Sequence, residues 1–236
     1  MQGGVAATEQ VFSAQRRAMV DGQIRTFDVT DQRVIRAFDL TRRELFLPEN
    51  LRGLAYSDAL LSLRSPDDAK FVRVLLQPMH LARMLQGAAP APDAHVLVVA
   101  GETGYAAALL LELAGSVVSL ECDAGLSAAA AAYAERAGAG RLTAVTGDLP
   151  AGCVEQGPYD LILVQGAVET NLDGLFGQLK PGGRLVAVET SLPNLGRRTG
   201  RVMLYQPING DVSGRALFDA TVPVLPAFRS TPAFVF

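Results

Sequence analysis

The segment AGETGY, residues 100–105, has the layout of a nucleotide-binding loop. A run of β-forming residues, VLVVA at 96–100, stops at Gly101, and Gly104 comes where a helix begins. Glycines let backbone N–H groups approach a ligand closely, and a helix N-terminus favours an anion. Glu102 stands between the two glycines, where a ligand should press. The loop is therefore either a working cofactor site or one whose chemistry has been lost.

Three more groups of polar residues follow predicted strands. Glu121 ends the next strand, twenty residues after Gly101, where an acid can accept hydrogen bonds from both ribose hydroxyls. Asp148 follows Gly147 after the third strand, and its short acid could meet the exocyclic amine of a purine. Gln165 lies just past a buried strand. An acid after a strand is as often a helix cap, but their regular placement favours one ligand site at the carboxyl ends of the strands.

Other kinds of catalytic site lack support in this sequence. Cys122 and Cys153 do not have a metal-ligand spacing, and a chain of 236 residues does not need a disulfide. His80 is predicted to be a partly buried surface residue, and no role is assigned to His95. We find no Ser-His-Asp order, no paired histidines and no P-loop lysine. We therefore predict no metal site and no hydrolase or kinase chemistry.

Composition predicts one globular domain. Apolar residues make up 49% and charged residues 19%, and the net charge of -3 and pI near 5.4 favour neither a nucleic-acid partner nor a membrane. The basic pairs at 16–17, 42–43 and 197–198 are scattered, which is typical of solvated surface. Residues 1–20 contain no apolar core of a secretory signal, so we expect a reducing, cytoplasmic location.

The first 90 residues are predicted to be mainly helical. In VTDQRVIRAFDL (29–40), Thr30 can cap a helix with an apolar stripe, and Thr41 with Glu44 offers a second capping pair. SPDDAK at 65–70 has the character of an exposed loop. PMHLARMLQG predicts a helix from Pro78 to Gly87.

From residue 93 strands and helices alternate. Buried strands are predicted at 96–100, 116–121, in RLTAVTG, YDLILVQGA and RLVAVE, with helices in YAAALLLELAG, AGLSAAAAAYAERAG and around LDGLFGQLK. LKPGG is predicted to be a turn, and the last third to be a β-hairpin. This order predicts a doubly wound, mainly parallel α/β sheet covered on both faces.

These motifs together resemble the protein-L-isoaspartate O-methyltransferase family. The resemblance is carried by MVDGQIRTFDVTDQRVIRAFDLTRRELFLPENLRGLAYSD, QPMHLARML, the loop ending TGY, SLECD, YDLILVQGA and LKPGGRLV. It implies a Rossmann-like methyltransferase fold with an N-terminal helical extension, and S-adenosylmethionine as cofactor. The implied cofactor residues are Ala100, Gly101, Glu102, Thr103, Gly104, Tyr105, Glu121, Asp148, Leu149 and Gln165.

The cofactor loop departs from the usual methyltransferase pattern. That pattern is acid-x-Gly-x-Gly-x-Gly, and its aligned positions here are Val98, Ala100, Glu102 and Gly104. Glu102 adds bulk and negative charge where the methionine tail of the cofactor should pass. Alternatively, Glu102 pairs with the ammonium of the cofactor and replaces the acid missing at Val98.

The acceptor side departs as well. Where the family commonly has Gln-Thr-Ile-Ser-Gln-Pro, this chain has RVLLQP, so hydroxyls are replaced by Arg73 and its apolar neighbours. Arg73 and Gln77 are the candidate catalytic residues. Arg73 could hold the acceptor carboxylate in a charge-assisted pair, or it could be a surface residue.

We predict a single methyltransferase-like domain over 1–236, with a helical cap and acceptor-side region at 1–90 and a cofactor-binding sheet with a C-terminal hairpin at 91–236. Three functions remain open: methylation of isoaspartyl residues in proteins or peptides, methylation of a different small carboxylate or amine, and a non-catalytic binding role. The final PAFVF is expected to dock on the protein's own core.

Overall fold

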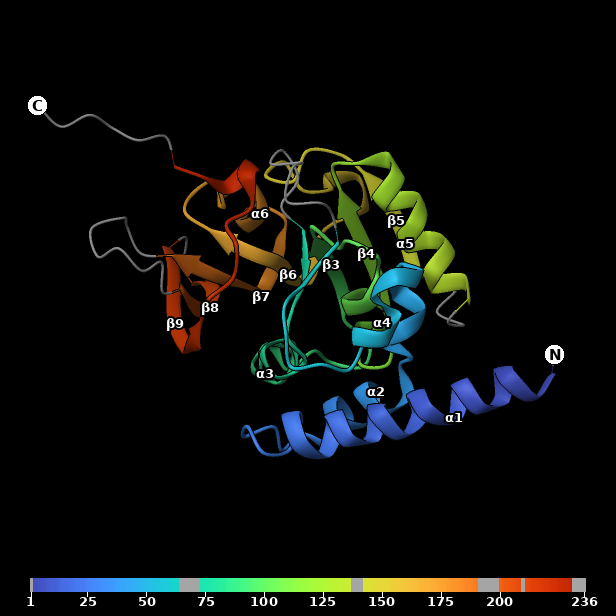
Figure 1. Cartoon of the computed structure of the whole chain (residues 1–236). Coiled ribbons are helices and arrows are strands. Elements are labelled where there is room, and N and C mark those ends of the chain that lie inside the picture. Colours follow the sequence, from blue (N-terminus) through green and yellow to red (C-terminus); the bar gives the residue numbers. More distant parts are fainter. Residues whose placement is uncertain (1, 64–72, 137–141, 191–199, 209–210, 231–236) are drawn as a thin grey trace, which may run out of the picture.

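The computed structural model describes residues 2–63, 73–136, 142–190, 200–208 and 211–230 of the chain. Its centre is a seven-stranded sheet in the order β5-β4-β3-β6-β7-β8-β9 (Figure 1). The first five of these are parallel neighbours, and β8 and β9 add antiparallel pairs. The strands are β3 (His95–Val99), β4 (Ser116–Glu121), β5 (Leu142–Thr146), β6 (Tyr159–Val168), β7 (Leu179–Thr190), β8 (Gly200–Ile208) and β9 (Asp211–Ala220). The predicted fold class is confirmed.

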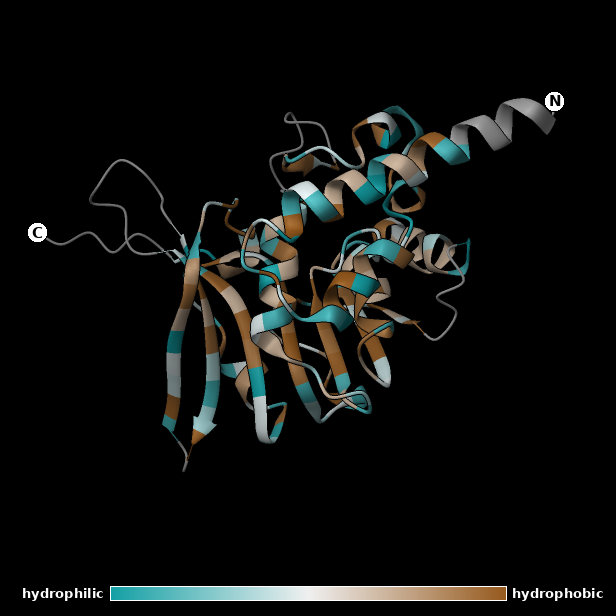
Figure 2. Cartoon of the chain, turned by 90° about the horizontal axis from the view of Figure 1, so that it is seen from below, coloured by the Kyte–Doolittle hydropathy of each residue, from teal (hydrophilic) through white to brown (hydrophobic). Residues whose placement is uncertain are grey.

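Both faces of the central strands are buried, which explains their continuous apolar sequence. In β3, Val96 and Val98 belong to one core cluster, while Leu97 and Val99 belong to the other. Figure 2 shows the apolar colour running along the inner strands, whereas the outer strands alternate. The first cluster is shared with α3 (Pro78–Ala88) and α4 (Tyr105–Leu111), and the second with α6 (Asp173–Phe176). α5 (Ala124–Arg136) packs against β4 and β5.

An N-terminal cap covers the sheet, with α1 and α2 below it in Figure 1. It consists of α1 (Gln2–Met19), a π-helical turn η1 (Val20–Ile24), α2 (Gln32–Leu40), and two 3-10 turns, η2 (Arg43–Phe46) and η3 (Glu49–Leu54). Its apolar residues belong to the same cluster as one face of the sheet. The predicted helical extension is therefore confirmed, and it is part of the core of the protein.

A small second sheet joins the cap to α3. β1 (Leu61–Ser62) pairs antiparallel with β2 (Val74–Leu75), and the Leu63 N–H donates to the Arg73 carbonyl at 3.2 Å. We call residues 73–75 the strap. The strap belongs to the two-stranded sheet, so its hold on the main sheet comes from side chains and loop contacts.

Some local predictions were wrong. α2 is capped by Asp31, whose carboxylate accepts from the Arg33 N–H at 2.8 Å, and not by Thr30. Thr41 does not cap the next helical turn with Glu44, because it is the C-cap of α2, where its N–H donates to the Ala37 carbonyl; η2 has no side-chain cap. LKPGG lies within β7, where Gly182 has a φ of 79° and the register with β6 shifts.

Further observations concern the cysteines, the helices and three segments that lie outside the described residues. Cys122 and Cys153 are both free thiols. No helix in the described part of the chain combines the length and apolar character needed to cross a membrane. The loop at 65–70, the pair at 197–198 and the terminal PAFVF lie outside the described residues.

Candidate functional site

The order of strands reverses between β3 and β6, and such a reversal is where open α/β sheets bind ligands. Val99 of β3 pairs with Val164 of β6, so the loop that starts at Ala100 lies beside Gln165. Gln165 is 2% exposed, and neither atom of its side-chain amide has a partner among the described residues. The buried hydroxyl of Thr103 is likewise unpartnered. Buried polar atoms without partners are costly, so this crevice has the chemistry of a site for a polar ligand.

The loop backbone has the conformation of a glycine loop although two glycines are missing. φ is 57° at Ala100, 55° at Glu102 and 87° at Gly104, all in the left-handed region that favours glycine. These are the three positions at which the usual methyltransferase pattern has glycine. The sequence has therefore changed at two of them while the backbone path has been retained, at a cost of roughly 1–3 kcal/mol for each strained residue.

Glu121 ends β4 directly against this loop. Its Oε1 accepts from the backbone N–H of Glu102 at 3.0 Å, and its Oε2 accepts from the N–H of Cys122 at 3.1 Å. The Gly147 N–H donates to the Glu121 carbonyl at 2.8 Å, which brings the end of β5 to the same place. The sequence-predicted loop, acid and β5 end are thus brought together.

Arg73 from the strap completes the arrangement. Its Nε lies 2.9 Å from Glu121 Oε1 and its Nη2 lies 3.0 Å from Oε2, and both side chains are 1% exposed. Its Nη2 also lies 3.2 Å from Cys122 Sγ. The surface alternative for Arg73 is therefore wrong. The partner of its guanidinium is an internal carboxylate, in the two-pronged geometry that arginine prefers.

Glu102 is buried in the same cluster. Burial raises the pKa of its carboxyl well above the usual value, the negative charge of Glu121 adds to this, and the nearby Arg73 and Arg43 oppose it. The backbone of Val74 in the strap also lowers this pKa, while Oε1 of Glu102 has no hydrogen-bond partner among the described residues. Glu102 thus faces the strap and the arginines.

Arg43 is a member of the site that the sequence analysis missed. It is fully buried, its Nη2 donates to the Leu76 carbonyl at 2.9 Å, and its guanidinium lies 4.8 Å from the centre of the Tyr105 ring. Burial lowers its pKa. The prediction that the pair at 42–43 is solvated surface is wrong for Arg43. The sequence did contain a sign that Arg43 is buried. Arg43 lies three residues before the apolar Phe46, and residues with this spacing share one face of a 3-10 turn.

The remaining predicted residues lie around the cluster. Leu149 and Tyr105 are buried, Asp148 is exposed, and Gln77 is half-buried at the N-cap of α3, where its Nε2 lies 3.4 Å from the Asp58 carbonyl. Their contacts with a cofactor or acceptor stay predictions. Among the described residues no group of histidines, cysteines and acids could hold a metal ion.

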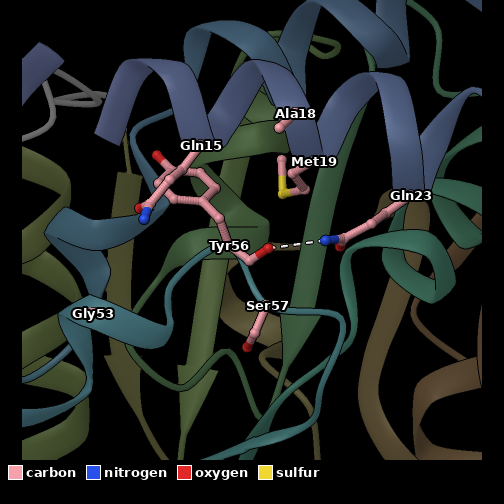
Figure 3. A pocket seen from close by; sticks show the side chains of 7 residues that line it. All are labelled: Gln15, Ala18, Met19, Gln23, Gly53, Tyr56 and Ser57. Carbon is pink, nitrogen blue, oxygen red and sulfur yellow. Dashed lines mark hydrogen bonds between the residues drawn. The ribbon is translucent and has the colours of Figure 1, made fainter. Parts of the chain in front are cut away.

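A separate cavity of about 330 Å³ lies between α1 and the residues around Tyr56 (Figure 3). Gln23 Nε2 donates to the Tyr56 carbonyl there, at 2.9 Å. The lining residues are Gln15, Ala18, Met19, Gln23, Gly53, Tyr56 and Ser57. None of the predicted site residues is among them, so this cavity is distinct from the crevice at the sheet.

Known proteins match the chain over most of its length. Residues 14–195 match the model of the family described as protein-L-isoaspartate(D-aspartate) O-methyltransferase. A protein-L-isoaspartate O-methyltransferase from Koribacter versatilis is 38% identical over 175 residues, which are 74% of this chain and 76% of that one. One from Roseiflexus castenholzii is 34% identical over 200 residues, covering 85% and 86%.

Solved structures agree with this match. A protein-L-isoaspartate O-methyltransferase superposes with a TM-score of 0.76 at 26% identity, over 89% of this chain and 65% of that one. A Plasmodium falciparum protein of the same description, in complex with S-adenosyl-L-homocysteine, superposes with a TM-score of 0.72. Its identity of 16%, over 90% of this chain and 98% of that one, establishes likeness of fold alone.

Proposed function

This chain belongs to the protein-L-isoaspartate(D-aspartate) O-methyltransferase family, and we propose that it transfers a methyl group from S-adenosylmethionine to a carboxylate of damaged aspartyl residues in proteins or peptides. The family predicted from the sequence is thereby confirmed. The observation that carries the proposal for this chain is the crevice at the strand reversal, where the loop from Ala100 meets Glu121 and the unpartnered amide of Gln165.

The acid that the cofactor would need at the end of β4 is already engaged by the protein itself. Glu121 is the acid expected to receive the ribose hydroxyls, and both of its oxygens already accept hydrogen bonds from Arg73 and backbone N–H groups. Glu102 fills the centre of the loop and is 1% exposed. The proposed function therefore requires that the strap leave this position before the cofactor enters.

Arg73 supports a carboxylate as the methyl acceptor. Methyl transfer to a carboxylate needs an ionised oxygen held in the correct approach, and it does not need a strong base. The guanidinium of Arg73 holds the carboxylate of Glu121 in a bidentate pair, so this position already recognises a carboxylate. Gln77, four residues later at the start of α3, is proposed to lie on the same acceptor side.

Methylation of a matched pair of peptides tests the proposal. The purified protein is given S-adenosylmethionine with a labelled methyl group and a peptide that contains L-isoaspartate, or the same peptide with ordinary aspartate. We expect base-labile methyl ester on the isoaspartyl peptide alone. Equal labelling of both peptides, or no labelling of either while S-adenosylhomocysteine binds, would contradict the proposed acceptor.

A non-catalytic binding protein is the second candidate, and one observation favours it. The buried pair of Arg73 and Glu121, together with Glu102, places three ionisable groups where a cofactor would lie. If this arrangement is permanent, neither S-adenosylmethionine nor S-adenosylhomocysteine binds to the folded protein. Calorimetric titration with both ligands distinguishes this candidate from a methyltransferase that acts on another small acceptor, because that enzyme would still bind them.

A further inference from the structure

The carboxylate of Glu121 is saturated with hydrogen bonds from the protein itself. A carboxylate offers about four acceptor positions, and four are taken. Two are taken by Arg73, at 2.9 and 3.0 Å, and two by the backbone N–H groups of Glu102 and Cys122, at 3.0 and 3.1 Å. The Glu121 side chain is 1% exposed. A diol that approached this acid would find neither a free acceptor position nor access.

Of the four donors, the two from Arg73 are the ones that can be withdrawn without changing the main sheet. The N–H groups of Glu102 and Cys122 belong to the loop and to the end of β4, which the parallel ladder fixes. Arg73 belongs to the strap, whose ladder with β1 has two residue pairs among the described residues, beside the Leu63–Arg73 backbone hydrogen bond and the burial of Leu75 in the core. Small ladders open more easily than central strands.

The strap closes over the loop at a second point. The backbone of Val74 lowers the pKa of the Glu102 carboxyl, and its neighbour Arg73 pairs with Glu121, so consecutive residues of the strap act on the two acids of the site. If the strap moves away, both acids lose a partner together. Movement of the acceptor-side segment and opening of the cofactor crevice are thus one event.

We infer that Arg73 occupies the position of the cofactor's ribose on Glu121, so that S-adenosylmethionine and its product compete with the strap for this site. The inference rests on the proposed function, because it names the internal competitor of the proposed cofactor. It also explains how a chain with the family's loop backbone can bury the acid of the site completely.

Replacement of Arg73 by methionine tests the inference. Methionine is unbranched and apolar, so it fills much of the same space without pairing with Glu121. Titration of wild type and Arg73→Met with S-adenosylhomocysteine should give at least about a tenfold lower Kd for the variant, which corresponds to about 1.4 kcal/mol. Arg201→Met is the control, since Arg201 pairs with Asp219 on the surface at 3.3 Å and should leave the Kd unchanged.

The direction of the change separates competition from a merely structural role. If Arg73 only supports the fold, its loss weakens or leaves unchanged the binding of S-adenosylhomocysteine, and the inference is overturned. Absence of binding to both folded proteins overturns it too, because something other than Arg73 then excludes the ligand. If Arg73→Met does not fold, Arg73→Lys is the second variant, because lysine keeps the positive charge but cannot make the bidentate pair with Glu121. Arg73→Lys should bind S-adenosylhomocysteine more tightly than wild type. An equal or weaker Kd overturns the inference.

The proposed function is tested separately, by methylation of the isoaspartyl peptide. If Arg73→Met binds S-adenosylhomocysteine more tightly and neither protein methylates the isoaspartyl peptide, the competition is supported and the proposed activity is lost. If wild type methylates the peptide and both proteins bind the ligand equally, the activity stands and the competition is refuted.

Discussion

At the scale of single residues, Glu102 is the most unusual feature of the site. It has a φ of 55°, is 1% exposed, and keeps one carboxyl oxygen without a partner among the described residues. Each of these properties is unfavourable for a glutamate. The loop backbone is therefore strained at Glu102, and a glycine there would relieve the strain. The raised pKa of Glu102 favours the neutral carboxyl over the carboxylate.

The stability of the protein should reveal this pKa. Because the folded protein binds the Glu102 proton more tightly than the unfolded chain, this stabilising contribution is complete below the usual pKa of 4.5 and is lost as pH rises toward the folded-state pKa. Glu102→Gln removes the titration. The free energy of unfolding of Glu102→Gln minus that of wild type should therefore increase with pH above 4.5, by up to about 1.4 kcal/mol per unit.

Urea unfolding at a series of pH values measures this difference. Glu9→Gln is the control, because Glu9 is exposed and pairs with Arg42 at the surface. A difference that stays constant with pH would show that folding does not raise the pKa of Glu102, and the electrostatic description of the site would need revision.

The pair of Arg73 and Glu121 should show strong coupling. Glu121→Gln leaves a buried guanidinium without its counter-charge, which costs about 3–5 kcal/mol. Adding Arg73→Met removes that unpaired charge, so the double variant should be more stable than Glu121→Gln alone. Chemical unfolding of wild type, both single variants and the double variant measures the coupling. Additive losses would mean that the two side chains do not depend on each other.

The sequence predicted some of these residues and not their contacts. The loop and Glu121 were identified from their places after buried strands, and the structure brings them within hydrogen-bond distance. Arg73 was identified as a departure from the family, but its partner Glu121 could not be predicted because it lies 48 residues away. The residues before Arg73 also have no periodicity that would show which way its side chain points. Arg43 was read as surface because a basic pair carries no sign of which member is buried.

At the scale of elements, the turn from β3 to α4 is held by a close approach of backbone and side chain. A Cβ at Gly101 would lie 2.0 Å from Ser119 Oγ of β4, a distance that atoms cannot adopt. This contact explains why Gly101 is required although it is not one of the three glycines of the usual methyltransferase pattern. The loop is therefore fitted to β4 as well as to the crevice.

Gly101→Ala should therefore destabilise the protein by about 1–3 kcal/mol through overpacking. Ser119→Ala removes the obstructing hydroxyl, so the double variant should regain part of the lost stability, measured as the urea midpoint. Gly22→Ala is the control, because a Cβ at Gly22 would meet nothing within 4 Å. A loss in Gly101→Ala that Ser119→Ala does not reduce would contradict the steric explanation.

Elements with strong periodicity were predicted well. The strand at 116–121 was predicted with the bounds of β4, and the helix from Pro78 ends one residue beyond the expected Gly87. The 3-10 turn at Arg43–Phe46 was not predicted as such, because so short an element buries too few side chains to leave a period in the sequence.

At the scale of the whole molecule, the cap and the sheet share one apolar cluster, which runs from Met19 in α1 to Val188 in β7. The doubly wound fold itself follows from the alternation of strands and helices, and it is confirmed. That the chain is a single domain stays a prediction, and it can be tested where polar contacts join the cap to the sheet.

Gln86 of α3 makes such a contact with the start of α2. Its Oε1 accepts from the Thr30 and Asp31 N–H groups at 2.7 and 2.9 Å, and its Nε2 donates to the Asp28 carbonyl at 2.9 Å. Loss of these bonds in Gln86→Ala should cost about 2 kcal/mol. In a protein of this size that lowers the Tm by about 4–8 °C.

The shape of the transition tests whether the cap and the sheet are one cooperative unit. If they are, Gln86→Ala shifts the whole calorimetric peak, and the calorimetric enthalpy stays equal to the van't Hoff enthalpy. If the cap is a separate unit, the variant gives two peaks, because only the cap loses stability. Gln206→Ala is the control, since the Gln206 side chain makes one hydrogen bond to a described residue, at 3.4 Å to the Gly182 carbonyl, and should leave the peak in place.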